Sequence, residues 1–412
     1  MTVKASSGIR PSGTFGPATL ALNGGLERDP ITRAIAPNIS MSVNNAFVPG
    51  NGAFSVDGIE DLTALPFLYA GWTNPTVRQL ERRIAALEGA DDALSTATGM
   101  AAAAAVFFTF LKAGDHLIIS DVCYAGVYEL ARKVLPDYGI EVTGVNLSNI
   151  DELAAAIRPN TRLVHAETPC NPLLRLTDLS AVAEVTRAHG VLLVVDSTLA
   201  TPAVTRPLEH GVDLVMHSLT KFINGHGDAL GGCVAGRKEL VERIRSRAGV
   251  YLGAAQSAQN AWLIMRGIDT LFPRIEAMSA SAGKVAAFLQ QHPAVTSVVY
   301  PGLASHPQRD LVQRQMRVPG AMITFQVRNL DETAHRIARE ARVFDYAFSI
   351  GHQRSLAVLL KTGDLMTGAT FALNPAQLAD YRRYAGAGVL RLSIGLEDTQ
   401  DLIEDLDHVL RV

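Results

Sequence analysis

The sequence predicts an α/β protein with a mostly parallel sheet, helices on both faces of that sheet, and a second, smaller α+β domain. Three observations support this fold class. Strand and helix signals alternate from residue 116 to residue 217, the pattern changes beyond about Ile268, and 412 residues exceed a single core of ordinary size. We therefore expect an amino-terminal arm over residues 1–66, a large domain over 67–267 and a small domain over 268–412.

The composition argues against several classes of function. Hydrophobic residues make up 48% of the chain, charged residues make up 19%, and the formal net charge is -3, so no basic surface for nucleic acid or an anionic membrane is expected. Cys123, Cys170 and Cys233 lie far apart, which predicts neither a disulfide framework nor a metal site. The amino terminus lacks the apolar core of a signal peptide, and no apolar run approaches membrane-spanning length. These features predict a soluble protein of the reducing cytoplasm.

The first 66 residues carry Pro, Gly, Ser and Asn throughout, which predicts an extended arm rather than part of a core. The apolar residues of ITRAIAPNISMSV are regularly placed. Their spacing favours an arm that lies on another surface over a loose terminus.

Two helix starts follow the arm. Pro75 and Thr76 open a stretch with apolar residues at helical spacing. Thr98, Gly99 and Met100 open an alanine-rich helix, and glycine lets other backbone approach closely. Free N–H groups and the helix dipole make such a start a candidate phosphate site, although a packed alanine-rich helix is the simpler interpretation of these residues alone.

Beyond residue 115 the predicted strands and helices alternate and are joined by short turns, which indicates a mostly parallel sheet. The successive segments are HLIISD, YELARKVLPDYG, EVTGVNL, IDELAAAI, TRLVHAE, LSAVAEVTRAHG, VLLVVD and DLVMHS.

Two of these strands end in residues that can carry chemistry. The aliphatic run Val191–Val195 ends in Asp196, and DLVMHS is followed by Ser-Leu-Thr-Lys, so Lys221 stands just past a strand end. Ligands of open α/β sheets bind at the carboxyl ends of the strands. An acid followed 25 positions later by such a lysine is the pair that a pyridoxal phosphate (PLP) enzyme needs, with Asp on the pyridine nitrogen and Lys as the Schiff base. A solvated loop lysine is the alternative for Lys221 alone.

With DST at residues 196–198 and SLTKFINGHGD around Lys221, the chain resembles the Cys/Met-metabolism family of PLP-dependent enzymes, which includes cystathionine synthases and lyases and methionine γ-lyases. The resemblance runs from the Asn-Pro-Thr segment at 74–76 to LSIGLED near the carboxyl terminus. It implies fold type I, PLP as cofactor, and a homotetramer made of two dimers with shared active sites. Ser197 departs from the Asn that is usual after the cofactor Asp.

The resemblance assigns roles to several residues around the cofactor. Thr98, Gly99 and Met100 correspond to the family's Ser-Gly-Met phosphate site, which the hydroxyls of Ser218 and Thr220 would complete. Tyr124 would stack on the pyridine ring and assist proton transfer. Asn171, in a motif that also contains Glu167, would contact the phenolic oxygen. Structural roles, such as a tyrosine at a core edge or a stiff proline-rich turn, are the alternatives.

The family shows Tyr-x-Arg-x-x-Asn-Pro-Thr before the first large helix. Tyr69 matches the tyrosine that reaches the cofactor phosphate and substrate of the other subunit, but Gly71 replaces the arginine. One expected phosphate ligand is therefore missing, and the sequence leaves open whether another cation takes its place.

In the second domain, Arg391 of GVLRLSIGLED would clamp the substrate carboxylate. FSIGHQRSL resembles the family's Ser-Leu-Gly-Gly-x-Glu-Ser-Leu, with Ser349, Gly351 and Ser355 among the matches, and Ser355 is expected near the substrate. Arg354 stands where the family often has Glu. This reversal argues against an ordinary cystathionine site, and we hypothesise that Arg354 meets an anionic group, either a distal substrate carboxylate or the cofactor phosphate.

The resemblance implies γ-elimination or γ-replacement on an L-amino acid, such as an O-substituted homoserine or a sulfur amino acid, with Lys221 and Tyr124 moving protons. The motifs do not separate lyase from transferase, nor do they exclude β-elimination by a C–S lyase. A PLP-binding regulator without turnover is a further alternative. Lys221, Asp196, Tyr124 and Arg391 favour an enzyme.

Overall fold

The computed structural model describes residues 15–367 and 371–411, and its centre is a seven-stranded sheet in the order β1-β7-β6-β5-β4-β2-β3. The pairs β2–β3, β2–β4, β4–β5 and β5–β6 are parallel, and only the two pairs that include β7 are antiparallel. The mostly parallel sheet expected from the alternating pattern is therefore confirmed. Its strands are β1 (Asp92–Thr96), β2 (His116–Ser120), β3 (Glu141–Val145), β4 (Thr161–Glu167), β5 (Leu192–Asp196), β6 (Leu214–His217) and β7 (Gly232–Gly236).

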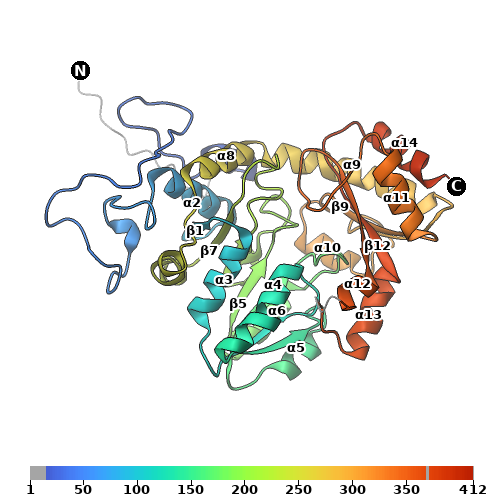
Figure 1. The fold of residues 1–412 in the computed structure, drawn as a ribbon, viewed down its shortest axis with the longest axis horizontal. Helices are drawn as coiled ribbons and strands as arrows, with labels where there is room; N and C mark the ends of the chain where they lie inside the picture. The colour runs from blue at the N-terminus through green and yellow to red at the C-terminus, as the bar shows by residue number, and fades with distance from the viewer. Residues whose placement is uncertain (1–14, 368–370, 412) are drawn as a thin grey trace.

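Helices cover both faces of this sheet (Figure 1). On one face, apolar residues of α3 and α7 pack on Leu163 and Val194. On the other face, α5 and α6 pack on Val164 and Val195, while α2 and α8 pack near Val215. Covering both faces explains the continuous apolar runs of the central strands. The helices are α2 (Pro75–Glu88), α3 (Gly99–Phe110), α4 (Ala125–Glu129), α5 (Ile150–Ala156), α6 (Leu179–Ala188), α7 (Lys238–Ile244) and α8 (Ala258–Asp269).

A second sheet, in the order β10-β11-β12-β9-β8, forms the smaller carboxyl-terminal part. The long helix α9 (Leu271–Gln291) runs along the molecule into this part (Figure 1). The predicted boundary at residue 267 falls inside α8 and stays a prediction. The other elements are β8 (Val295–Val299), α10 (Arg309–Gln315), β9 (Met322–Val327), α11 (Leu330–Glu340), β10 (Asp345–Tyr346), β11 (Leu356–Lys361), α12 (Thr362–Thr367), α13 (Pro375–Ala385), β12 (Gly388–Ser393) and α14 (Thr399–Leu410).

The described part of the arm contains two short helices, α1 (Pro17–Asn23) and the 3₁₀ helix η2 (Leu62–Ala64). Leu20 and Ala21 of α1 are buried, and the Arg83 guanidinium donates to the Ala21 carbonyl, so this helix belongs to the core. Burial of two adjacent apolar residues after Pro17 at the first helical position explains why a helix forms in this glycine-rich segment.

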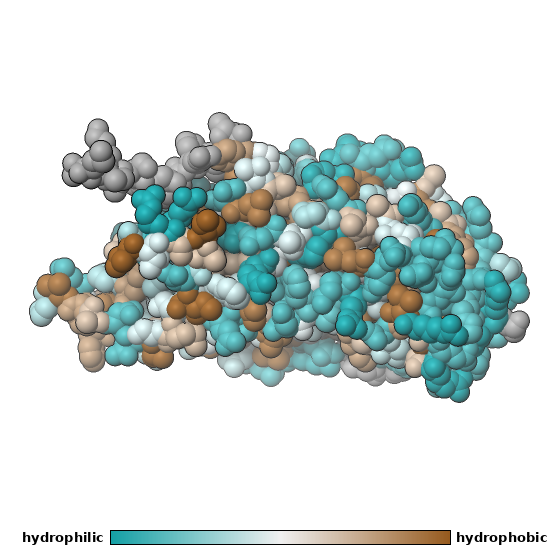
Figure 2. Space-filling model, turned by 90° about the horizontal axis from the view of Figure 1, so that it is seen from above, coloured by the Kyte–Doolittle hydropathy of each residue, from teal (hydrophilic) through white to brown (hydrophobic). Residues whose placement is uncertain are grey.

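Beyond α1 the arm exposes large apolar side chains. Ile31 is 89% exposed, Val48 is 65% exposed and Phe54 is fully exposed. Figure 2 shows hydrophobic residues gathered at the arm end of the molecule, whereas the opposite end is mainly hydrophilic. Among the described helices, none combines the length and apolar character needed to cross a lipid bilayer.

Candidate active site at the carboxyl ends of the central strands

Three neighbouring strands end at one edge of the large sheet and bring the predicted residues together. β4 ends at Glu167, β5 ends at Asp196, and β6 leads through Ser218 to Lys221. The amino terminus of α3 reaches the same edge. A Cβ added to Gly99 would lie 2.8 Å from the Cβ of Ser218. Open α/β sheets bind ligands at this end, where the carboxyl ends of the parallel strands meet.

Lys221 is held by the second domain. Its Nζ donates to Ser349 Oγ at 2.9 Å. Burial and the nearby positive charge of Arg391 lower the pKa of Lys221. The neutral serine hydroxyl accepts a hydrogen bond but brings no carboxylate charge that would raise the pKa again. The geometry therefore makes it easier for Lys221 to lose its proton and become the free amine, which is the form that attacks a carbonyl and accepts a proton.

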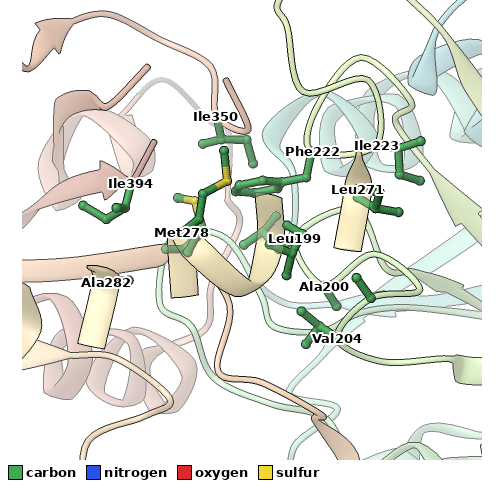
Figure 3. Close-up of a cluster of buried hydrophobic side chains, with 14 of the residues drawn as sticks. Leu199, Ala200, Val204, Phe222, Ile223, Leu271, Met278, Ala282, Ile350 and Ile394 are labelled. Carbon is green, nitrogen blue, oxygen red and sulfur yellow. The ribbon is translucent and has the colours of Figure 1, made fainter. Parts of the chain in front are cut away.

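The contact between Lys221 and Ser349 rests on an apolar cluster. Phe222 and Ile350, the residues that follow these two, point into this cluster together with Met278 of α9 (Figure 3). Ser349 has φ 95°, a region that non-glycine residues rarely adopt. Such strain persists only where packing enforces it, so the fold places the Ser349 hydroxyl at the lysine. The sequence motif matched Ser349 but did not indicate this contact.

Arg391 of β12 lies beside the same cluster. Its Nη1 donates to Asn171 Oδ1 at 2.9 Å and its Nη2 donates to the Ser349 carbonyl at 3.0 Å. Burial lowers the pKa of Arg391 to about 10, although the charge of Glu167 acts in the opposite direction. A buried guanidinium with neutral hydrogen-bond partners is suited to an incoming carboxylate.

Glu167 fixes the loops that carry two predicted site residues. Its two carboxylate oxygens accept hydrogen bonds from the backbone N–H groups of Tyr124 and Asn171, each at 2.7 Å. Burial and the charge of Asp196 raise the pKa of Glu167 well above its usual range. In the sequence, Glu167 matches a motif that assigns it no role. Its position at a strand end was the signal that could have indicated one.

Asp196 is 5% exposed, and its Oδ1 accepts the N–H of Thr198 at 3.0 Å. The Thr198 hydroxyl in turn accepts the N–H of Ser218 at 2.8 Å. These two bonds tie the acid at the end of β5 to the loop that leads to Lys221.

The start of α3 has the geometry of a phosphate site. Thr98 caps the helix by accepting the Ala101 N–H, so the N–H groups of Gly99 and Met100 precede the first intrahelical bonds. Because any side chain at residue 99 would collide with Ser218, the glycine allows the Ser218 hydroxyl to lie at this helix start. The N–H groups, the helix dipole and the hydroxyl suit the phosphate of PLP, while Asp196 and Lys221 suit its ring nitrogen and aldehyde.

Tyr124 is 48% exposed and its ring lies against Gly126, where an added Cβ would come within 2.9 Å of Tyr124 Cε1. The same Cβ would lie 3.1 Å from Met100 Sδ, which places Met100 beside Tyr124. Thr220 lies next to Lys221, but its hydroxyl exchanges hydrogen bonds with the backbone of Gly231 at 3.1 and 3.2 Å.

Gly71 lies against the ring of Tyr69. A Cβ at this position would lie 2.6 Å from Cε1 of Tyr69, so a larger side chain here would require the tyrosine ring to move. Tyr69 itself is half-exposed. Among the described residues, no side-chain hydrogen bond connects it to the Lys221 cluster.

Two predicted substrate residues form no hydrogen bond or ion pair with Lys221 in the described part of the chain. Ser355 is fully buried; its hydroxyl donates to Glu397 Oε2 and accepts the Gly395 N–H, both at 2.8 Å. Arg354 is exposed and forms no hydrogen bond or ion pair within the described parts of the chain. Their roles toward substrate stay predictions.

Fold and site together define the class of this protein, which is an enzyme that uses PLP on a fold type I scaffold. The chain belongs to the family described as Cys/Met metabolism PLP-dependent enzymes, whose model matches residues 18–411.

Comparison with known proteins gives the same family. The chain is 42% identical to a canavanine gamma-lyase from Pseudomonas canavaninivorans over 95% of this chain and 96% of the relative. It is 38% identical to an L-methionine gamma-lyase from Pseudomonas deceptionensis, over 96% and 98% of the two chains. The structure of cystathionine gamma-lyase from Lactobacillus plantarum complexed with L-serine superposes with a TM-score of 0.85 and 31% identity, covering 96% of this chain and 98% of that one. The protein is thus a PLP-dependent enzyme of γ-elimination or γ-replacement on amino acids.

Proposed function

We propose that this enzyme is a γ-lyase for an O-substituted homoserine that carries a guanidino group, with canavanine as the first candidate substrate. The similarity to a canavanine gamma-lyase over nearly the full length of both chains supports this choice. Arg354, at the position where the family often has Glu, argues against an ordinary cystathionine site. A guanidinooxy substrate also offers an oxygen leaving group on the γ-carbon.

The observation that carries the chemistry is the state of Lys221. Its amine has a lowered pKa, donates to a neutral hydroxyl, and lies in the field of Arg391. When bound at this edge, PLP supplies an aldehyde for that amine and an electron sink for charge that develops beside the substrate nitrogen. The N–H groups and hydroxyl suited to its phosphate, and the Asp196 carboxylate suited to its ring nitrogen, lie at the same end of the sheet as this lysine.

Side chains of the protein bind the substrate and move its protons. Arg391 binds the α-carboxylate with its guanidinium and so orients the α-carbon toward Lys221. Lys221 Nζ accepts the α-proton, while Ser349 Oγ keeps the amine in reach. Tyr124 Oη and Lys221 Nζ move protons between the β-carbon and the departing oxygen. Glu167 holds the backbone of Tyr124 and Asn171 so that both residues stay at the site.

We also propose that the enzyme is an assembly of identical subunits and acts in the cytoplasm. The exposed apolar side chains of the arm, including Ile31 and Phe54, support an assembly of identical subunits in which the arm is covered. We expect a dimer of dimers in the cytoplasm, with Tyr69 completing the site of a neighbouring subunit. Light scattering of the purified protein measures its mass and tests this assembly.

The function is tested by a substrate panel that measures 2-oxo acid, ammonia and γ-substituted products. Canavanine is expected to have a kcat/KM at least about tenfold above those of methionine and cystathionine, since binding a distal polar group discriminates strongly. Arginine, which has a CH₂ in place of the γ-oxygen, is the matched control and is expected to bind without elimination. Faster turnover of methionine or cystathionine than of canavanine would contradict the proposed substrate.

A further inference from the structure

His352 is a half-buried side chain that the reaction above does not use. It lies in the segment between β10 and β11, at the position of the second glycine in the family's Ser-Leu-Gly-Gly motif. Its imidazole forms no hydrogen bond within the described parts of the chain. A Cβ added to Gly227 would lie 1.8 Å from Cε1 and 2.0 Å from Nε2 of this ring. One edge of the ring therefore packs directly on the backbone of Gly227.

Gly227 belongs to a tight loop, residues 224–228, that begins three positions after Lys221. The Gly225 N–H donates to the Lys221 carbonyl at 2.8 Å, and the side-chain amide of Asn224 donates to Asp228 Oδ1 at 2.9 Å. Gly227 has φ 70°, a left-handed conformation that glycine adopts without strain. Because these bonds connect the two ends of the loop, a displacement at Gly227 is transmitted to the backbone of Lys221.

The neighbouring residues of the β10–β11 segment hold the same loop. A Cβ added to Gly351 would lie 2.4 Å from the backbone nitrogen of Phe222, so the two backbones are in contact. The side-chain N–H₂ group of Gln353 donates to the carbonyls of Gly225 and His226 at 2.9 and 3.3 Å. Three consecutive residues of the second domain thus contact the chain that follows Lys221.

These three residues are fixed in turn to the second domain. The Gly351 N–H donates to the Ser393 hydroxyl of β12 at 2.9 Å, and the Gln353 carbonyl accepts the Leu396 N–H at 2.9 Å. Residues 351–353 therefore form a clamp between β12 and the loop after Lys221.

The His352 ring is neutral in this clamp. Burial and the positive charge of Lys221 lower the pKa of His352, and Arg354 acts in the same direction, whereas Asp228 and Asp345 act in the opposite one. Because the pKa lies below its ordinary value of 6.5, the ring carries no charge above neutral pH. It fills the space beside the loop without adding a cation next to the lysine.

We propose that His352 is a positioning residue for Lys221: its ring, packed on Gly227, keeps the clamp on the loop and so holds the amine at the Ser349 hydroxyl and away from bulk water. Burial is the first cause of the lowered pKa of Lys221, so a loosened clamp that admits water raises this pKa toward its ordinary 10.5. This role depends on the proposed reactivity of Lys221, but not on which substrate the enzyme uses.

The first test measures the pKa of Lys221 in the full-length, PLP-free chain. Competitive labelling with acetic anhydride between about pH 7 and pH 11, followed by mass spectrometry of the peptide that contains Lys221, gives this pKa. We expect His352→Gly to raise it by about one unit, so that the fraction of free amine at neutral pH falls about tenfold. His352→Phe keeps a flat ring on Gly227 and is expected to retain the wild-type pKa.

His189→Gly, at an exposed histidine that follows α6, is the control and is expected to leave the Lys221 pKa unchanged. A wild-type pKa in His352→Gly would refute the proposal even if Tm falls, since a merely structural role changes stability alone. The same rise in His352→Phe as in His352→Gly would also refute it, because the ring would then not be what holds the loop.

The second test asks whether His352 acts through Gly227. Gly227→Ala places a methyl group on the ring and is expected to raise the Lys221 pKa as well. In the double variant with His352→Gly the methyl group no longer meets a ring, so the shift should be clearly smaller than the sum of the two single shifts. Additive shifts would contradict the contact. Both tests omit PLP and substrate, so their outcome is independent of whether canavanine is turned over.

Discussion

Two buried clusters of charged residues in this protein differ in how their cations are paired. In the first, Arg245 contacts Glu81, Asp92 and Glu242 at 2.9, 3.2 and 3.0 Å, and Arg78 contacts Glu81 and Asp92 as well. These carboxylates raise the pKa of Arg245 even though burial lowers it. In the second cluster, Arg391 is also buried and Lys221 is partly buried, but their hydrogen bonds go to a hydroxyl, an amide and a carbonyl.

The type of hydrogen-bond partner distinguishes a cation that stabilises the fold, such as Arg245, from the cations expected to act on the substrate, Lys221 and Arg391. Carboxylate partners stabilise the charged form of a buried cation, whereas neutral partners leave the cost of burial uncompensated and lower its pKa. Lowered pKa values of Lys221 and Arg391 therefore coincide with the edge of the sheet where the substrate is expected. The network around Arg245 joins α2, β1 and α7 and is expected to contribute to stability alone.

The largest effect is expected when the Lys221 amine is removed. Lys221→Ala is expected to lower kcat by at least about 10³-fold, because the nucleophile and the main proton acceptor are lost together. Steady-state kinetics and the mass of the borohydride-reduced protein measure this. Lys238→Ala, at an exposed lysine paired with Asp61, is the control and is expected to keep both activity and cofactor adduct.

The matching change in the structural network is Arg245→Met. We expect a loss of about 3–5 kcal/mol in unfolding free energy, since Glu81 and Asp92 then lose a buried partner. Urea unfolding measures it. The kcat per folded molecule should not change, and a large fall in kcat with normal stability would break the distinction between the two clusters.

Arg391→Lys keeps the charge but loses the planar fork. We expect kcat/KM to fall about 10- to 100-fold, mainly through KM, because a carboxylate then loses one of two charge-assisted bonds. Kinetics with a substrate that has a free carboxylate measures this. Arg237→Lys, at a half-exposed site, is the control, and equal effects of both changes would contradict the proposed role of Arg391.

Glu242 allows a test by pH. Burial raises its pKa to about 7 from an ordinary 4.5, so between these values the folded state binds more protons than the unfolded state. Stability from this group is therefore present at pH 4.5 and falls as pH rises to 7. Glu242→Gln is expected to raise the unfolding free energy by about 1–2 kcal/mol at pH 8 and to change little at pH 4.5. Thermal unfolding at both pH values measures the difference, and equal shifts would contradict the raised pKa.

The smallest effect is expected at the exposed Arg354, whose charge solvent screens. If this arginine contacts the cofactor phosphate in the assembled protein, Arg354→Glu lowers PLP affinity by about threefold. Titration with PLP tests a contact with the cofactor phosphate, and substrate kinetics test a contact with a distal substrate carboxylate. No change in either would remove the hypothesis that Arg354 meets an anionic group.

The sequence alone determined the architecture and one half of the site. Alternating apolar runs and helical patterns predicted the parallel sheet, and parallel strands with crossover helices must end at one common edge. Asp196 and Lys221 could therefore be expected together, and Gly99 could be expected at a helix start. These inferences depend on local patterns and on one topological rule.

Only the tertiary structure decided how the second domain completes the site. Ser349 contacts Lys221 across 128 positions, and Arg391 contacts Asn171 across 220 positions. The pairing of Glu167 with Asp196 likewise depends on the register between β4 and β5. Strand patterns do not encode such contacts, because they arise when separate elements pack on a shared core. The apolar cluster around Phe222, Met278 and Ile350 is that core, and it brings the hydroxyl of one domain to the amine of the other.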